Sequence, residues 1–98
     1  MGLKVNPPPK FLCAWEAKAN NTSYLAETDG FVTATTETQL VAIVGLTDGD
    51  DPPTTTRIVN MYYGGEAGRV AGIFMPVKRG DYWKVTNANV VWWIPFNY

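Results

Sequence analysis

Turn-forming residues interrupt this chain so often that they argue against a helical fold. Nine glycines and seven prolines are spread over 98 residues. No window of about a dozen residues repeats apolar positions at helical spacing without a Gly, a Pro or a β-branched cluster. Val, Thr, Ile and the aromatic residues, which favour strands, fill the segments between these breaks. The sequence therefore predicts an all-β fold, a small antiparallel β-sandwich of the jelly-roll type with about seven or eight short strands.

The expected strands lie between turn signals. They are 11–17, a short piece at 24–25, 31–36, 40–46, 55–63, 69–77, 82–86 and 90–96. The segment 40–46 is apolar on both faces, which is typical of a central strand. Trp15 shares a face with Phe11 and Cys13 and is expected in the core. One of Tyr82 and Trp83 should face the core while its neighbour faces outward with Lys84.

The length of the chain allows one domain. Residues 1–10 include Pro7, Pro8 and Pro9 and should form an extended Pro-rich lead-in, with 11–98 as a single β-sandwich domain. The lead-in fits a junction to another segment or to other proteins, an arm laid on a neighbour, or a truncated end. Whether Met1 is the natural start stays open.

An enzyme is not expected, because the side chains that most enzymes use are missing. The chain has no histidine, which removes the usual general base and the commonest metal ligand. The single Cys13 cannot form an internal disulfide or a cysteine metal cluster, and its apolar neighbours suggest a small buried hydrophobe. We expect no catalytic residue, no cofactor and no metal.

The net charge and the hydropathy of the chain argue against two classes of partner, nucleic acids and membranes. Eight Lys and Arg against nine Asp and Glu give a net charge of −1, which argues against nucleic-acid binding. No run approaches about 18 apolar residues, so membrane insertion is not expected.

The last strand carries apolar side chains on both faces. Trp92 and Phe96 lie on one face and Val91 and Trp93 on the other. One face can enter the core, and the second needs another cover that a small two-layer sandwich does not provide. The sequence therefore predicts a subunit interface that includes Val91, Trp92, Trp93 and Phe96. The alternative is that Trp93 lies under a loop of its own chain.

Two loops are candidates for receptor contact. The segment 48–51 places Asp48, Asp50 and Asp51 within four residues, and carboxylates can bind calcium. A solvated turn is the favoured alternative, because two prolines follow and the spacing differs from known calcium loops. Tyr62 and Tyr63 precede two glycines and suit either a recognition surface for sugars or proteins or an ordinary strand end. We expect Asp48, Asp50, Tyr62 and Tyr63 to be the receptor-contact residues.

Three segments in order carry a resemblance to known proteins. Residues 24–32, YLAETDGFV, look like the "F-x-A-P-x-D-G-x-Y" entry of the complement globular-head and tumour-necrosis-factor-like jelly rolls. Residues 77–85, VKRGDYWKV, are similar to the "L-x-x-G-D-x-V-x-V" hairpin of that superfamily, and 91–96 stand where those domains end in an aromatic strand. The loop 45–54, GLTDGDDPPT, and the hairpin 76–85 also resemble tip domains of phage tail fibres and related virion proteins. The similarity spans 24–98, and because complement-type heads are longer, some of their strands should be short or absent here.

The resemblance implies a homotrimer with the aromatic terminal strand near a three-fold axis. It also implies a non-enzymatic phage or prophage structural protein, a fibre-tip or virion-surface head that binds a host surface glycan or protein. The alternatives are a monomeric carbohydrate-binding or adhesin module of a bacterial surface protein, using Tyr62 and Tyr63, and a virion decoration protein without receptor binding. The expected location is the virion surface or, for the adhesin, the bacterial cell surface. The sequence does not identify the receptor or the host.

Overall fold

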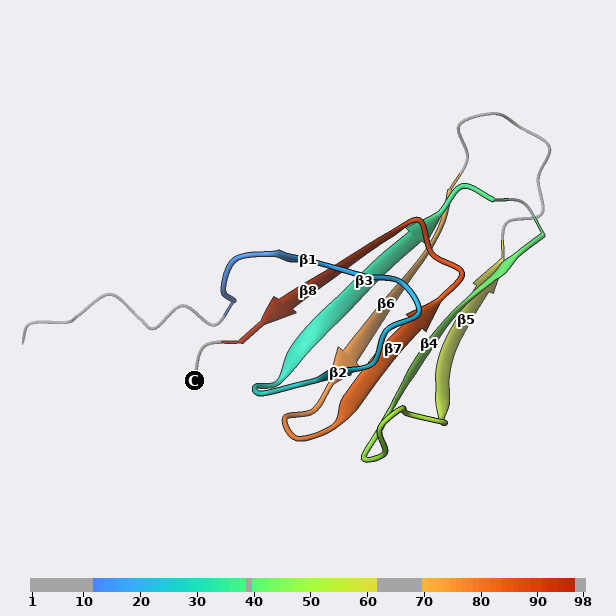
Figure 1. Cartoon of the computed structure of the whole chain (residues 1–98). Helices are drawn as coiled ribbons and strands as arrows, with labels where there is room; N and C mark the ends of the chain where they lie inside the picture. The colour runs from blue at the N-terminus through green and yellow to red at the C-terminus, as the bar shows by residue number, and fades with distance from the viewer. Residues whose placement is uncertain (1–11, 39, 62–69, 97–98) are drawn as a thin grey trace, which may run out of the picture.

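Eight short strands make up the regular secondary structure of the residues that the structure describes. The structure is a computed structural model in which residues 12–38, 40–61 and 70–96 are described. The strands are β1 (Glu16–Lys18), β2 (Tyr24–Leu25), β3 (Gly30–Thr36), β4 (Ala42–Asp48), β5 (Thr56–Met61), β6 (Ala71–Val77), β7 (Tyr82–Thr86) and β8 (Val90–Pro95) (Figure 1). No helix occurs within the described ranges. The predicted all-β class is confirmed.

The strands form two antiparallel four-stranded sheets, in the orders β1-β8-β3-β6 and β2-β7-β4-β5. The chain passes from one sheet to the other at every connection except β4 to β5, and the first strand pairs with the last. An eight-stranded double sheet with this order is a jelly roll. The predicted fold, a small antiparallel sandwich of eight short strands, is therefore confirmed.

The core lies between the two sheets, where every second side chain points inward. Trp83 of β7 and Trp93 of β8 stack across it with ring centroids 5.5 Å apart. Around them pack the buried side chains Val32, Ala34, Ile43, Ile73, Met75, Val77, Val85 and Val91. Trp83 faces inward while Tyr82 and Lys84 are only half-buried, so the predicted alternation on this strand is confirmed.

The prediction for the first strand was wrong in its extent and in its buried residue. The segment 11–17 was expected to be a strand with Trp15 in the core, but β1 begins at Glu16 and Trp15 is 55% exposed. Ala17 lies opposite Trp92 across the strand pair, and Trp15 lines a hollow with Thr33 and Trp92 on the outside of the sheet. Cys13 is half-buried rather than fully buried.

The strand expected at 40–46 begins two residues later. Leu40 has a φ of 60°, a left-handed conformation that a strand does not accommodate, so β4 begins at Ala42. The predicted central position is confirmed, because β4 lies between β7 and β5.

Two loops at one end of the sandwich are joined by hydrogen bonds. The backbone N–H of Gly80 donates to the carbonyl of Ala26 at 2.8 Å, and the N–H of Ala26 donates to the carbonyl of Asp81 at 2.9 Å. The Asp29 carboxylate accepts a hydrogen bond from the N–H of Arg79 at 2.7 Å. These bonds fix the β2–β3 connection against the β6–β7 turn.

Candidate functional site

The two faces of β8 have different surroundings, and the prediction for one of them was wrong. Val91 and Trp93 were expected at a subunit interface, but they are 2% and 6% exposed and belong to the core of their own chain. Trp93 can enter the core because Gly30 has no side chain. A Cβ on this residue would lie 2.5 Å from Cη2 of Trp93, so the missing side chain leaves the space that the indole fills.

The opposite side of the same sheet carries a group of exposed or half-buried apolar side chains, here named the aromatic face. Its members are Trp15, Phe31, Phe74, Val90, Trp92 and Phe96. The remaining outward positions of these strands are Ala17, Thr33, Thr35, Gly72, Pro76 and Ile94. None of these side chains is charged.

Ring contacts hold part of the aromatic face in place. Phe31 packs on Phe74 with centroids 4.6 Å apart and meets Phe96 edge-on at 4.9 Å. Phe74 nevertheless remains 53% exposed and Trp92 40% exposed. Of the four predicted interface residues, the structure thus places Trp92 and Phe96 on this outer face and the other two inside.

The carboxylate of Asp48 closes its own loop. It accepts hydrogen bonds from the backbone N–H groups of Asp50, Thr54 and Thr55 at 2.8, 2.8 and 2.7 Å. These donors, that of Asp50 foremost, hold the pKa of the Asp48 carboxyl far below its usual range. Asp48 therefore acts as a turn residue, as in the favoured alternative for this loop, whereas Asp50 is exposed.

The remaining sequence-based predictions concern the tyrosine pair and metal binding. Tyr62 and Tyr63 lie outside the described residues. Within the described ranges, no three His, Cys, Asp or Glu side chains come together as a metal site.

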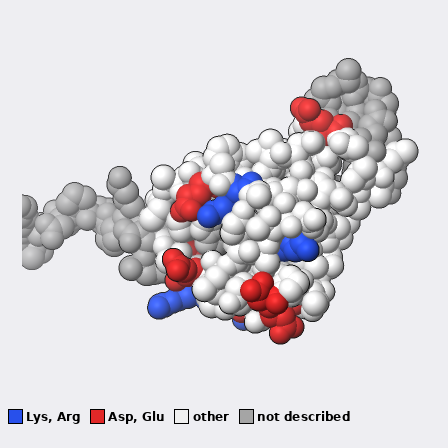
Figure 2. All heavy atoms as spheres, in the orientation of Figure 1, with Lys and Arg blue, Asp and Glu red and all other residues white. Residues whose placement is uncertain are grey.

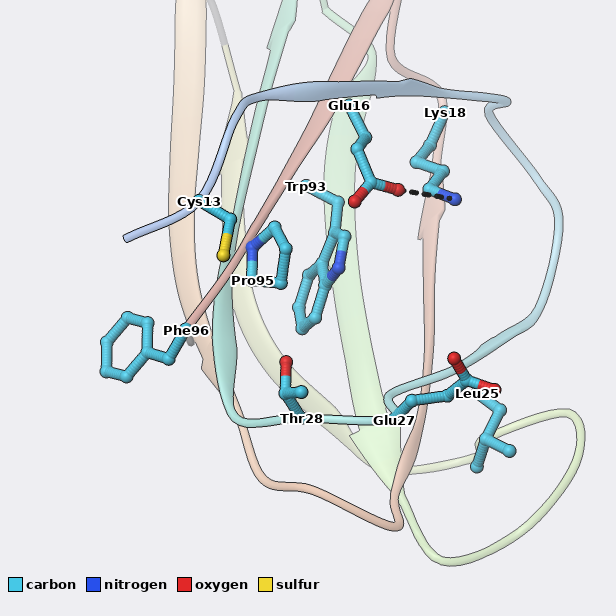
Figure 3. A pocket seen from close by; sticks show the side chains of 9 residues that line it. All are labelled: Cys13, Glu16, Lys18, Leu25, Glu27, Thr28, Trp93, Pro95 and Phe96. Atoms are coloured by element: carbon cyan, nitrogen blue, oxygen red, sulfur yellow. Dashed lines mark ion pairs between the residues drawn. The ribbon is translucent and has the colours of Figure 1, made fainter. Parts of the chain in front are cut away.

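A groove that the sequence did not suggest lies beside β1 (Figure 3). Its volume is about 350 Å³, and it is lined by Cys13, Glu16, Lys18, Leu25, Glu27, Thr28, Trp93, Pro95 and Phe96. Figure 3 shows Glu16 and Lys18 along one wall, Thr28 and Glu27 along the opposite wall, and Trp93 between them. One wall comes from β1 and the other from the β2–β3 connection, which links the two sheets.

The charged groups of the groove are only partly paired. The ammonium of Lys18 lies 3.4 Å from a carboxylate oxygen of Glu16 and 4.9 Å from the centroid of the Tyr24 ring. The side chain of Glu27 forms no hydrogen bond or ion pair with the described residues. The alternation of Glu16 and Lys18 on an edge strand was the available sequence signal, but the sequence did not reveal that 27–28 lies opposite.

Charged side chains elsewhere are sparse. Figure 2 shows Lys and Arg, and Asp and Glu, in small separate groups on a mostly uncharged surface. Among the described residues, no helix has the length and apolar character needed to cross a membrane. Comparisons with models of protein families, with curated proteins and with solved structures found no match to this chain.

Proposed function

We propose that this chain is a head domain of a phage or prophage structural protein, at a fibre tip or on the virion surface. It forms a homotrimer and binds a receptor on the host cell without catalysing a reaction. The observation that carries the proposal is the aromatic face, an uncharged surface of exposed rings on one sheet of a jelly roll. The resemblance of 45–54 and 76–85 to tip domains of phage tail fibres supplies the biological context.

The aromatic face supplies part of the apolar area that an association surface needs. Aromatic side chains bury roughly 150–250 Å² each when fully covered. With the exposure of Trp15, Phe74, Val90 and Trp92, the patch amounts to roughly 400 Å² of apolar surface. That is about half of what one partner contributes to a standard interface, and Thr, Gly and Pro positions extend it.

A second copy of the chain suits this surface. Because none of its side chains is charged, two copies can meet without burying an unpaired charge. The resemblance, rather than the geometry, is the reason for proposing three copies.

A second candidate is a monomeric carbohydrate-binding module. The hollow lined by Trp15, Thr33 and Trp92 favours it, because two exposed indoles can stack on sugar rings. In that case Trp92 stays accessible to solvent in the free protein.

The mass of the protein in solution separates the two candidates. Light scattering after gel filtration should give about three times 10.8 kDa. Trp92→Glu and Phe74→Glu should each reduce the mass to that of one chain while the circular dichroism spectrum is kept. Val59→Glu, at an exposed apolar position on the other sheet, is the matched control and should stay trimeric. A monomeric wild-type protein would overturn the trimeric head and favour the carbohydrate-binding module.

A further inference from the structure

The groove of Figure 3 combines features that point to one chemical class of ligand. Apart from Phe96, which borders both, the groove and the aromatic face are formed by different residues. Glu16 and Lys18 lie opposite the inward residues Trp93 and Val91, whereas Trp92 points outward. A partner that covers the aromatic face therefore leaves the walls of the groove formed by Glu16 and Glu27 accessible.

The charge of the groove sets the first requirement on a ligand. Lys18 compensates Glu16 at 3.4 Å, while Glu27 is left without a partner among the described residues. The groove therefore carries one uncompensated negative charge, and it is complementary to a ligand with one positive charge.

The polar groups on both walls set the second requirement. Glu16 forms an ion pair with Lys18 and still has free lone pairs, and the Glu27 carboxylate has all of its acceptor positions available. The side chain of Lys18 is held by both Glu16 and the ring of Tyr24, so this wall is preorganised. A ligand with several hydroxyl donors uses these acceptors better than an alkyl ammonium alone.

The floor sets the third requirement. Pro95, which is half-buried, and the small part of Trp93 that stays exposed lie between the two walls, and their apolar surface suits the C–H face of a saturated ring. A volume of about 350 Å³ is at the lower end of the range for small-molecule sites, roughly 300–1,000 Å³.

We infer that this groove binds an amino sugar with a free ammonium group, as part of a host-surface glycan. The ammonium pairs with Glu27, ring hydroxyls donate to Glu16 and Glu27, and the ring lies against Trp93 and Pro95. This inference rests on the proposed receptor-binding function and names its ligand class. Each groove binds weakly, and a trimer gains affinity by engaging several sugars of one surface at once.

The test is an NMR titration of the full ¹⁵N-labelled chain with D-glucosamine at a pH where its amine is charged. Backbone signals of Glu16, Glu27 and Thr28 and the indole N–H signal of Trp93 should shift. Glucose and N-acetylglucosamine, which lack the positive charge, should bind less tightly. Glu27→Gln should weaken glucosamine binding about two- to fivefold, the effect of one solvent-accessible charge pair. Glu37→Gln, at an exposed glutamate outside the groove, is the matched control and should bind as the wild type does.

Three results would overturn the inference. They are the absence of shifts at the groove residues, equal binding of glucose and glucosamine, and equal binding of N-acetyl-lysinamide, which would identify a protein side chain as the ligand. The solution mass tests the trimeric head separately. A trimer without glucosamine binding contradicts only the site, and a monomer that binds glucosamine supports the site while contradicting the trimer.

Discussion

Gly30 is the residue at which strand β3 comes closest to the large side chain of Trp93. A Cβ there would lie 2.5 Å from Cη2 of Trp93 and 2.7 Å from the carbonyl oxygen of Ile94. The carbonyl belongs to the paired backbone of β8 and cannot move away without disturbing the sheet. The apparent turn glycine of the Asp29-Gly30 pair is thus also a packing residue.

We predict that Gly30→Ala lowers the free energy of unfolding by about 1–3 kcal/mol, the usual cost of overpacking a core. Urea denaturation measures the change. Gly72→Ala is the control, because a Cβ there meets its nearest neighbour, the carbonyl oxygen of Ala34, at 3.4 Å on the outer side of the sheet. A smaller loss for Gly30→Ala than for Gly72→Ala would contradict this account.

The carboxylate of Asp48 stabilises its own loop through hydrogen bonds to the backbone. It accepts three backbone N–H bonds, and its pKa lies far below the ordinary value. A carboxyl with a depressed pKa stabilises the folded state above the pKa of the unfolded chain, about 3.9. This contribution is lost as the pH falls below that value towards the folded pKa.

We therefore predict that Asp48→Asn lowers the melting temperature at neutral pH, and that the difference from wild type shrinks as the pH falls below about 4. Thermal unfolding followed by circular dichroism over a pH series measures both. Asp50→Asn, which alters an exposed carboxylate, should have little effect at any pH. A deficit for Asp48→Asn that is independent of pH would show that the charge of Asp48 does not matter.

At the scale of elements, β8 determines how the molecule is divided into core and surface. Its neighbours β1 and β3 pair with it on both sides, so it is the central strand with the most aromatic side chains. Trp93 points to Trp83 in the core, and Trp92 points to Thr33 and Trp15 outside. Neighbouring tryptophans in the sequence therefore have separate structural roles.

We predict that Trp93→Ala lowers the free energy of unfolding by about 3–5 kcal/mol, as expected for a large core truncation. Trp92→Ala should cost about 1 kcal/mol, because its ring is partly exposed. Chemical denaturation in dilute solution compares the two variants directly. Equal losses would mean that β8 is not oriented as described.

The free edge of β6 shows how the sandwich limits unwanted strand pairing. The side chain of Asn60 on β5 donates a hydrogen bond to the carbonyl of Gly72 at 2.9 Å, and Pro76 supplies no N–H. Both features reduce the ability of this edge to add a strand from another chain. Association through the aromatic face is therefore a more favourable route than association through this edge.

At the scale of the whole molecule, the sandwich leaves two surfaces with different chemistry. The aromatic face is uncharged, whereas the groove beside β1 has carboxylates on both walls. One surface suits association of identical chains, and the other suits a small polar ligand. The proposed head would use the aromatic face for assembly and the groove for ligand binding.

We predict that the melting temperature of the wild-type protein rises with protein concentration, because unfolding of a trimer separates the chains. Trp92→Glu should abolish this dependence, while Val59→Glu should retain it. Differential scanning calorimetry at several concentrations makes the measurement. A melting temperature that is constant over a wide range of concentrations would contradict the proposed assembly.

The sequence by itself determined the strands, because alternation of side chains and frequent turn residues are local properties. It predicted seven of the eight strands with both ends within two residues, and the central place of β4. It also predicted that one of Tyr82 and Trp83 faces the core. It did not determine which side of β8 faces inward, since both faces are apolar and the pattern has a period of two. The pairing with β3 and the space above Gly30 decided that Trp93 is buried and Trp92 exposed.

The groove also depended on the tertiary structure. Glu16 lies on strand β1 and Glu27 in the β2–β3 connection. They are brought to opposite walls only when β1 pairs with β8 and this connection is fixed by the β6–β7 turn. Pairing between strands at opposite ends of a chain leaves no local pattern in the sequence. The sequence therefore specified the strands and the type of sandwich, and the tertiary packing decided which surfaces are available for partners.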